Sequence, residues 1–337
     1  MAEVSVERAR PPVVPLWVVA AAFWSAIAVV VVARAAGAAD NAAIGTFGVI
    51  FTSIVVEALP FILMGAIASA AIAAFVPARA FTRIGALPRP VQVPAAALAG
   101  FAMPVCECGS VPVARRLIMR GLHPSAGIAF MLAAPILNPI VLASTWVAYG
   151  AAGKAAEMTI ARAGLGLTIA VAAGMLIGRA GEPVLRATRG ETEGHAHDHG
   201  QGAQAKAAAF AEHLATDFLF MGRFLVLGAA VAALLQTAVP QEWLSSVADT
   251  VVISALALMA MAIALSLCSE ADAFVAVSFT AFPLGSQLAF LVIGPVFDAK
   301  LAVLYGATFR RRFVPRLLAI AAPIALAGAL LFEALIG

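Results

Sequence analysis

Long uncharged apolar stretches alternate with short charged segments along this chain, and their lengths predict transmembrane helices. Residues 11–33 and 121–153 contain no Asp, Glu, Lys or Arg, and Glu57 is the only such residue between Asn41 and Pro77. About 20 apolar residues in a helix suffice to cross a bilayer. We therefore expect an all-α polytopic membrane protein with seven spans: 11–33, 46–76, 121–153, a span that ends at Gly178, 208–238, 284–308 and 314–336.

Two further apolar stretches, 90–114 and 246–282, are interrupted by polar or helix-breaking residues. Pro104, Gly109 and Pro112 break the first stretch, and three arginines lie on each side of it. Cytoplasmic loops collect Lys and Arg, so both arginine clusters favour the same side of the membrane. The pattern predicts a re-entrant hairpin over about 90–114, with a second over about 246–282. Irregular backbone at this depth requires burial in protein or a water-filled cavity.

The second half of the chain repeats landmarks of the first at a constant offset. Gly65 and Gly228 are 163 residues apart, and so are Glu107 and Glu270. Three spans and one hairpin in each half give an odd number of crossings, so the repeats are expected to be inverted, as in many transporters. The predicted organisation is an N-terminal transmembrane helix (1–40), a first repeat (41–178), a cytoplasmic linker (179–206) and a second repeat (207–337).

Composition supports the membrane assignment. Hydrophobic residues make up 63% of the 337 residues and charged residues 12%, whereas soluble domains carry roughly 25% charged residues. The net charge of +3 follows from a positive-inside bias and gives no reason to expect a nucleic-acid partner. The N-terminus imitates a signal peptide, but its apolar run exceeds the ~7–15 residues of a signal core. We expect a retained first helix with a cytoplasmic N-terminus.

The most unusual stretch is Cys106-Glu107-Cys108-Gly109, which lies inside the first predicted hairpin. Thiolates are soft donors that select soft metals and metalloids. Cys268 occurs near the equivalent place in the second hairpin and offers a third sulfur. The alternative is that these cysteines are small apolar packing residues. We predict that Cys106, Glu107, Cys108 and Cys268 belong to a substrate-binding site.

Acidic residues at membrane depth are costly and are functional candidates. Burial disfavours the charged form of Glu107 and Glu270, so we expect them to exchange protons near neutral pH, with Asp272 as an additional acid. A structural carboxylate bonded to backbone N–H groups remains the alternative. Asn138 and Asp298 lie beside helix-breaking prolines and are expected to contribute to the substrate site.

The predicted linker contains a run of histidines. Its candidate metal ligands are His195, His197, Asp198 and His199. His-rich tracts bind zinc-like ions. A solvated polar linker without metal explains the same residues equally well.

The chain resembles the bacterial predicted-permease family that includes the organoarsenical efflux permease ArsP. The resemblance rests on the Cys106–Gly109 stretch followed by Pro112, on the Ala134-Pro135-Ile136-Leu137-Asn138-Pro139 stretch, and on the pattern of spans. It implies a permease of the bacterial inner membrane, and one branch of the family exports trivalent organic arsenicals.

The leading hypothesis is a secondary transporter, coupled to protons, that exports a soft metal or metalloid species. Alternatives are a permease for another small solute, with structural cysteines, and a membrane thiol oxidoreductase. The chain has no phosphate-binding loop of the Walker type. We expect no enzymatic activity and no cofactor; the expected partners are a small-molecule or metalloid substrate and the lipid bilayer, and a homo-oligomer remains open.

Overall fold

The computed structural model describes residues 42–75, 87–103, 105–178, 184–186, 203–238 and 250–336. The chain divides into two compact units, Met1–Gly48 and Val49–Gly337. The second unit contains every candidate site residue that the structure describes. The expected first transmembrane helix and the histidines of the linker lie outside the described residues.

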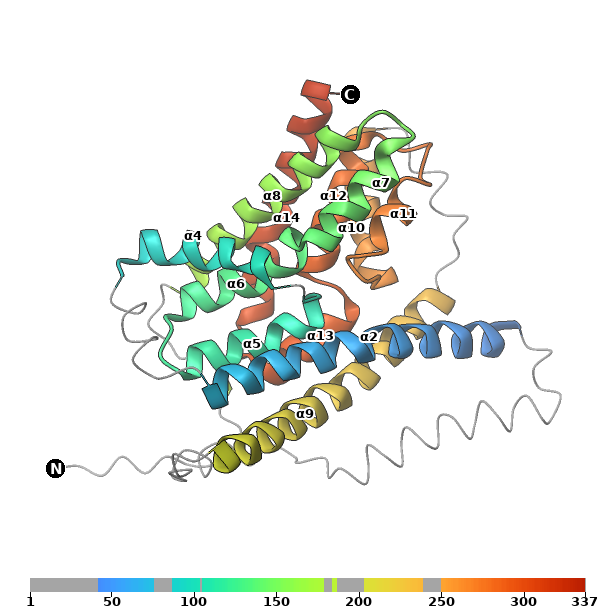
Figure 1. The fold of residues 1–337 in the computed structure, drawn as a ribbon. Helices are drawn as coiled ribbons and strands as arrows, with labels where there is room; N and C mark the ends of the chain where they lie inside the picture. Colours follow the sequence, from blue (N-terminus) through green and yellow to red (C-terminus); the bar gives the residue numbers. More distant parts are fainter. Residues whose placement is uncertain are drawn as a thin grey trace, which may run out of the picture. The chain divides into compact units, whose positions relative to one another are not determined.

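Among the described residues, six helical segments are long and apolar enough to cross a membrane (Figure 1). They are Ile44–Phe75, Pro124–Gly150, Ala155–Ile177, Ala207–Thr237, Leu284–Thr308 and Phe313–Ile336. Each coincides with one of the predicted spans, which confirms the all-α polytopic fold class. The remaining predicted span falls on residues that are not described.

Two of these six segments form the interior of the second unit. One consists of α6 (Pro124–Leu137) and α7 (Pro139–Gly150), and the other of α12 (Leu284–Val296) and α13 (Ala299–Thr308). In their most apolar parts 78% and 83% of residues are buried, against 22–39% in the other four segments. The other four therefore present most of their apolar side chains to the outside, as lipid-facing helices do.

Both interior segments are broken in the middle, and the residue at each break caps the helix that follows. The Asn138 side chain accepts a hydrogen bond from the N–H of Ile140 at 3.0 Å. The Asp298 carboxylate accepts one from the N–H of Leu301 at 2.6 Å. Such capping satisfies N–H groups that a helix start leaves without partners. The prolines identified in the sequence thus break these helices where polar caps are available.

The two stretches predicted as hairpins each contain short helices separated by a non-helical segment. The first holds α4 (Arg89–Ala99), the 3-10 turn η2 (Gly100–Ala102) and α5 (Glu107–Met119), and both α4 and α5 pack on α6. The second holds α10 (Val251–Leu265) and α11 (Asp272–Ala276), and both pack on α12. Re-entry of these stretches from one membrane side remains a prediction.

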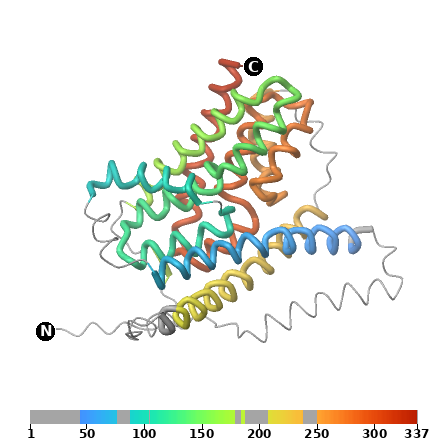
Figure 2. Tube along the Cα trace, in the orientation of Figure 1, coloured from blue at the N-terminus to red at the C-terminus, as the bar shows by residue number. Residues whose placement is uncertain are grey.

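The remaining helices complete a repeated order of elements, which Figure 2 traces along the chain. They are α2 (Ala42–Phe75) and α8 (Ala155–Ile177) in the first half, and α9 (Ala203–Ala238) and α14 (Phe313–Ile336) in the second. Each half thus reads as a long helix, an interrupted stretch, a broken span and another long helix. The inverted relation between the halves remains a prediction.

Two glycines at equivalent places let the long helices approach the interrupted and broken segments. A Cβ atom on Gly65 of α2 would lie 2.5 Å from the Cα of Gly109 in α5. A Cβ atom on Gly228 of α9 would lie 2.8 Å from the Cα of Lys300 in α13. Real Cβ atoms do not come this close to backbone atoms, so both positions require glycine at this helix separation.

A buried ion pair holds the second interrupted stretch in place. Arg162 of α8 forms two short contacts with Asp272, at 2.9 Å and 2.7 Å, and also bonds the hydroxyl of Thr145 at 2.8 Å. It donates as well to the carbonyl of Ser269 at 3.3 Å. Arg162 follows Lys154 and Glu157 after an apolar stretch, a position that suggests the outer end of a span. The structure instead buries Arg162 completely, because Asp272 supplies the opposite charge.

A second ion pair differs from expectation in its partners. Arg223 lies six positions after Asp217 in the sequence, which suggests a structural ion pair between them. Asp217 instead pairs with Arg116 of α5 at 3.0 Å and accepts a hydrogen bond from Ser69 at 2.6 Å. Arg223 instead lies over the rings of Phe220 and Phe224. Helix α5 therefore continues past the predicted end of the hairpin at residue 114, because its basic side chains find partners on α9.

Gly65→Ala and Gly228→Ala are each expected to destabilise the protein by about 1–3 kcal/mol, the usual cost of overpacking. Gly222→Ala is the matched control, because a Cβ atom there meets no atom within 4 Å. Thermal unfolding of the detergent-purified protein measures the effect. Equal stability of all three variants would show that α2 and α9 do not depend on these close approaches.

Arg162→Met is expected to leave Asp272 as an uncompensated buried charge, at a cost on the order of 3–5 kcal/mol. It should also loosen the segment that carries Cys268 and increase the rate at which a maleimide labels that thiol. Arg311→Met is the control, since Arg311 is exposed. Unchanged stability and labelling in Arg162→Met would contradict a holding role for this pair.

Candidate functional site

The start of helix α5 supplies the first part of the site. Cys106 has an extended backbone (φ −75°, ψ 177°) at the N-cap position, and Glu107 is the first helical residue. Only 1% of each residue is exposed. An acidic side chain at a helix N-terminus interacts favourably with the positive end of the helix dipole. The break before α5 thus places a thiol and a carboxylate together in the interior.

The non-helical segment between α10 and α11 supplies the second part. Helix α10 ends at Ser266, whose left-handed backbone conformation (φ 48°) turns the chain out of the helix. The following residues carry the buried Cys268 and Ser269. The thiol of Cys268 donates to Glu270 Oε2 at 2.7 Å, while Glu270 Oε1 has no hydrogen-bond partner among the described residues.

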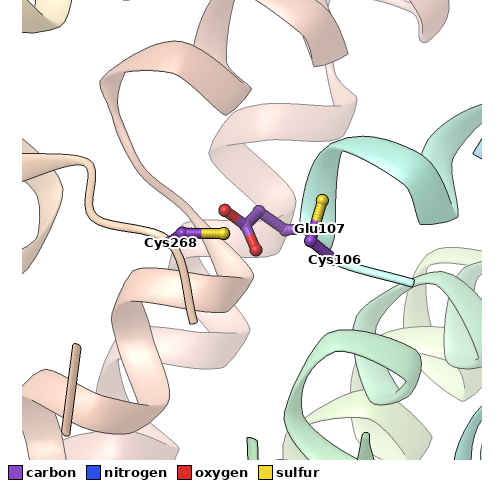
Figure 3. A group of neighbouring side chains, drawn as sticks. All are labelled: Cys106, Glu107 and Cys268. Atoms are coloured by element: carbon purple, nitrogen blue, oxygen red, sulfur yellow. The ribbon is translucent and has the colours of Figure 1, made fainter. Parts of the chain in front are cut away.

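The two parts meet, although 162 residues separate Glu107 from Ser269 along the chain. The Cys106 sulfur, a Glu107 carboxylate oxygen and the Cys268 sulfur all lie within 4.8 Å of one another. Figure 3 shows the carboxylate of Glu107 facing the sulfur of Cys268, which comes from a different segment. The third sulfur expected from the second half is therefore present. Cys108 does not belong to this three-residue group.

A buried lysine, which was not among the predicted site residues, completes the site. Lys300 Nζ lies 2.7 Å from Glu107 Oε1 and 3.5 Å from Asp298 Oδ2. It also donates to the carbonyl oxygens of Ser266 at 3.1 Å and Leu267 at 3.2 Å. A lysine inside the apolar stretch 284–308 is as costly as a carboxylate there. This cost is the signal by which Lys300 could have been recognised as a candidate from the sequence alone.

Glu107 is held at both carboxylate oxygens. Lys300 contacts Oε1, and the hydroxyl of Ser269 donates to Oε2 at 3.0 Å. The group thus links three elements: α5, the segment after α10, and α13. A small displacement of any one of them changes the distances around Glu107.

A small cavity adjoins these groups. Its lining includes all three cysteines, Glu107 and Lys300, and on the side of α2 it includes Glu57; the other residues are Ile54, Ala58 and Ser266. Thiols, carboxylates and an ammonium group therefore face one space. Such a mixture of soft and charged groups is suited to a small solute that reacts with sulfur.

The other predicted site residues that the structure describes have different surroundings. Asp298 contacts Lys300, whereas Asp272 is paired with Arg162 and Asn138 caps α7. Asp272 and Asn138 do not line the cavity. The candidate metal ligands His195, His197, Asp198 and His199 lie outside the described residues.

Comparison with known proteins identifies relatives along most of the chain. A protein of Bacillus subtilis (strain 168), named "UPF0718 protein YcgR", is 41% identical over 285 residues, which are 84% of this chain and 96% of the relative. A "Putative two-component membrane permease complex subunit" of Streptococcus mutans serotype c (strain ATCC 700610 / UA159) is 33% identical over 267 residues, 79% of this chain and 87% of the relative. No solved structure matches the chain significantly.

A family model described as "Predicted permease" (ArsP_1) matches residues 43–334, which include every described helix that carries a site residue. The match agrees with the resemblance found in the Cys106–Gly109 and Ala134–Pro139 stretches. Together with the six apolar spans, it identifies a multi-pass membrane permease. The chain belongs to the ArsP_1 predicted permease family.

Proposed function

We propose that this permease is a secondary transporter that exports a soft metal or metalloid species, such as a trivalent organoarsenical, in exchange for protons. The single observation that carries the proposal is the convergence of Cys106, Glu107 and Cys268 beside a cavity. Sulfur ligands from two separate segments bind one thiophilic atom only when the segments are close together. A transporter that moves these segments apart would thereby release its cargo.

The helix breaks support transport over a purely structural role for the cysteines. Transporter sites commonly lie where interrupted helices meet, because broken backbone provides polar groups at membrane depth. Here Cys106 lies at one break, Cys268 at another, and Lys300 next to a third. Packing residues have no reason to gather at three breaks that also surround a cavity.

Proton exchange is assigned to Glu107 and Glu270. Both are carboxylates near the thiols, and Glu270 has a buried oxygen without a partner among the described residues. Asp272, the third candidate from the sequence, is engaged by two contacts from Arg162 and is better suited to hold the segment than to exchange protons. We also propose that the protein lies in the inner membrane of a bacterial cell and that its N-terminus is in the cytoplasm.

A permease subunit that requires a partner chain is a second arrangement. It is favoured by the name of the Streptococcus mutans relative, which describes a subunit of a two-component complex. Expression of this chain alone in a host without related permeases distinguishes the two arrangements. Transport by the chain alone would favour a self-sufficient permease.

Cys106→Ser and Cys268→Ser are each expected to abolish resistance to a trivalent organoarsenical, because serine keeps the size but lacks the soft donor. Cys108→Ser should cause a smaller loss, since Cys108 lines the cavity without joining the three-residue group. Growth and arsenic accumulation measure the effect at matched membrane expression. Full resistance in the Cys106→Ser/Cys268→Ser double variant would refute the thiol site.

Glu107→Gln is expected to remove the dependence of transport on a pH gradient, because the amide cannot take up or release a proton. Arsenical uptake into everted vesicles, with and without an imposed gradient, measures this dependence. Glu212→Gln is the control, since Glu212 is an exposed residue of α9 outside the site. Gradient-driven uptake that persists at the normal rate in Glu107→Gln would contradict coupling through this carboxylate.

A further inference from the structure

Lys300 occupies a cation site that the protein itself builds. Its ammonium group is surrounded by the carboxylates of Glu107 and Asp298 and by the carbonyl oxygens of Ser266 and Leu267. Only 4% of the lysine is exposed. Oxygen atoms arranged in this way are the ligands that hard or borderline cations prefer. Here the lysine fills that place.

The backbone around Lys300 fixes this arrangement. Ser266 adopts the left-handed conformation that ends α10, and its hydroxyl accepts from the N–H of Ala299 at 3.1 Å. Gly228 of α9 lies against the backbone of Lys300 from the other side. The ammonium group is therefore positioned by α13, α9 and the end of α10 together, and not by one flexible loop.

Lys300 contacts the three-residue group through the carboxylate of Glu107. Among the described residues, no hydrogen bond joins Lys300 to the sulfur of Cys106 or Cys268, whereas Glu107 Oε1 lies 2.7 Å from its ammonium nitrogen. A divalent cation that uses both sulfurs and Glu107 must displace the ammonium or sit beside it. Two like charges a few ångströms apart in a buried site repel strongly. An uncharged thiophilic species needs only the sulfurs.

We propose that Lys300 is a specificity-determining residue that excludes divalent cations from the thiol site and reserves it for uncharged thiophilic cargo. This inference rests on the proposed function, because it concerns what the same thiols accept. Asp298, 3.5 Å from the ammonium group, compensates part of its charge while Glu107 engages it. In the described part of the chain, the ion pairs of Lys300 are those with Glu107 and Asp298, and they include neither Glu57 nor Glu270.

The chemistry of an uncharged arsenic(III) species fits this arrangement. Each arsenic–hydroxide bond is exchanged for an arsenic–sulfur bond, and the thiol proton leaves with the hydroxide as water. No electrons are transferred and no charge is added beside Lys300. Cd²⁺ bound by the same two sulfurs displaces two protons, so the net charge is unchanged. The carboxylate oxygen that would complete its coordination, however, is the one that Lys300 contacts.

The test compares two probes, Cd²⁺ and phenylarsine oxide, on the full chain purified in detergent. Lys300→Met removes the charge, Lys300→Gln removes it but keeps a hydrogen-bond donor for the carbonyls, and Lys300→Arg keeps it. The two neutral variants are expected to bind Cd²⁺ at least about tenfold more tightly than the natural protein. Lys300→Arg should bind Cd²⁺ as weakly as the natural protein does. Equilibrium dialysis measures Cd²⁺, and protection of the thiols from maleimide measures phenylarsine oxide.

The two probes separate the inference from the proposed function. Loss of the Cd²⁺ gain on adding Cys268→Ser to Lys300→Gln would confirm that the metal sits at the thiol site. Equal Cd²⁺ affinity in the natural protein and in a folded neutral variant overturns the role of Lys300, and so does an equal gain in Lys300→Arg. Phenylarsine oxide that fails to protect Cys106 and Cys268 in the natural protein instead contradicts the proposed function. If Lys300→Met fails to fold, Lys300→Gln is the neutral variant used for the comparison.

Discussion

The ion pair between Lys300 and Glu107 is the interaction on which the rest of the interior depends. Two opposite charges lie 2.7 Å apart, and both side chains are almost completely buried. Burial makes each charge costly by itself, and removing one partner of such a pair typically costs about 3–5 kcal/mol. The pair therefore fixes the distance between α5 and α13. The positions of the thiols and of the other groups around the cavity therefore depend on α5 and α13, which cannot separate without breaking this pair.

The helix breaks follow from the same requirement. An unbroken helix uses its carbonyl and N–H groups internally and has none to offer to a buried charge. At Ser266 the end of α10 releases carbonyl groups, and these bond the ammonium of Lys300. At Asp298 a carboxylate both caps α13 and neutralises the lysine. The prolines and the left-handed residue weaken the helices, but they supply the polar groups that make a buried lysine tolerable.

Local features of the sequence were enough to predict the spans, the breaks and several residues of the candidate site. Prolines beside Asn138 and Asp298 and the isolated acids Glu107 and Glu270 stand out from an apolar background, and each can be recognised without knowing its neighbours. The ion-pair partners of the charged residues were harder to predict from the sequence. The sequence position of Arg162 suggests a helix end, because its partner is 110 positions away. Asp217 has Arg223 near it in the sequence but pairs with the distant Arg116. Lys300 was not predicted as a site residue, because its contact with Glu107 joins positions that are distant in the sequence.

The two buried ion pairs are built for different tasks, and the difference lies in the cation. Arg162 grips Asp272 through two nitrogen atoms of a planar group and reaches a hydroxyl and a carbonyl as well, so it has one favourable geometry. An ammonium group is a compact charge on a flexible stem, and it can move between acceptors with little change in energy. Lys300 has such acceptors at hand, with Asp298 only slightly farther away than Glu107. Arg162 therefore lies outside the cavity lining and holds the segment that carries Cys268. Lys300 lines the cavity, where its ammonium group must be able to move when Glu107 changes its protonation state or its partner.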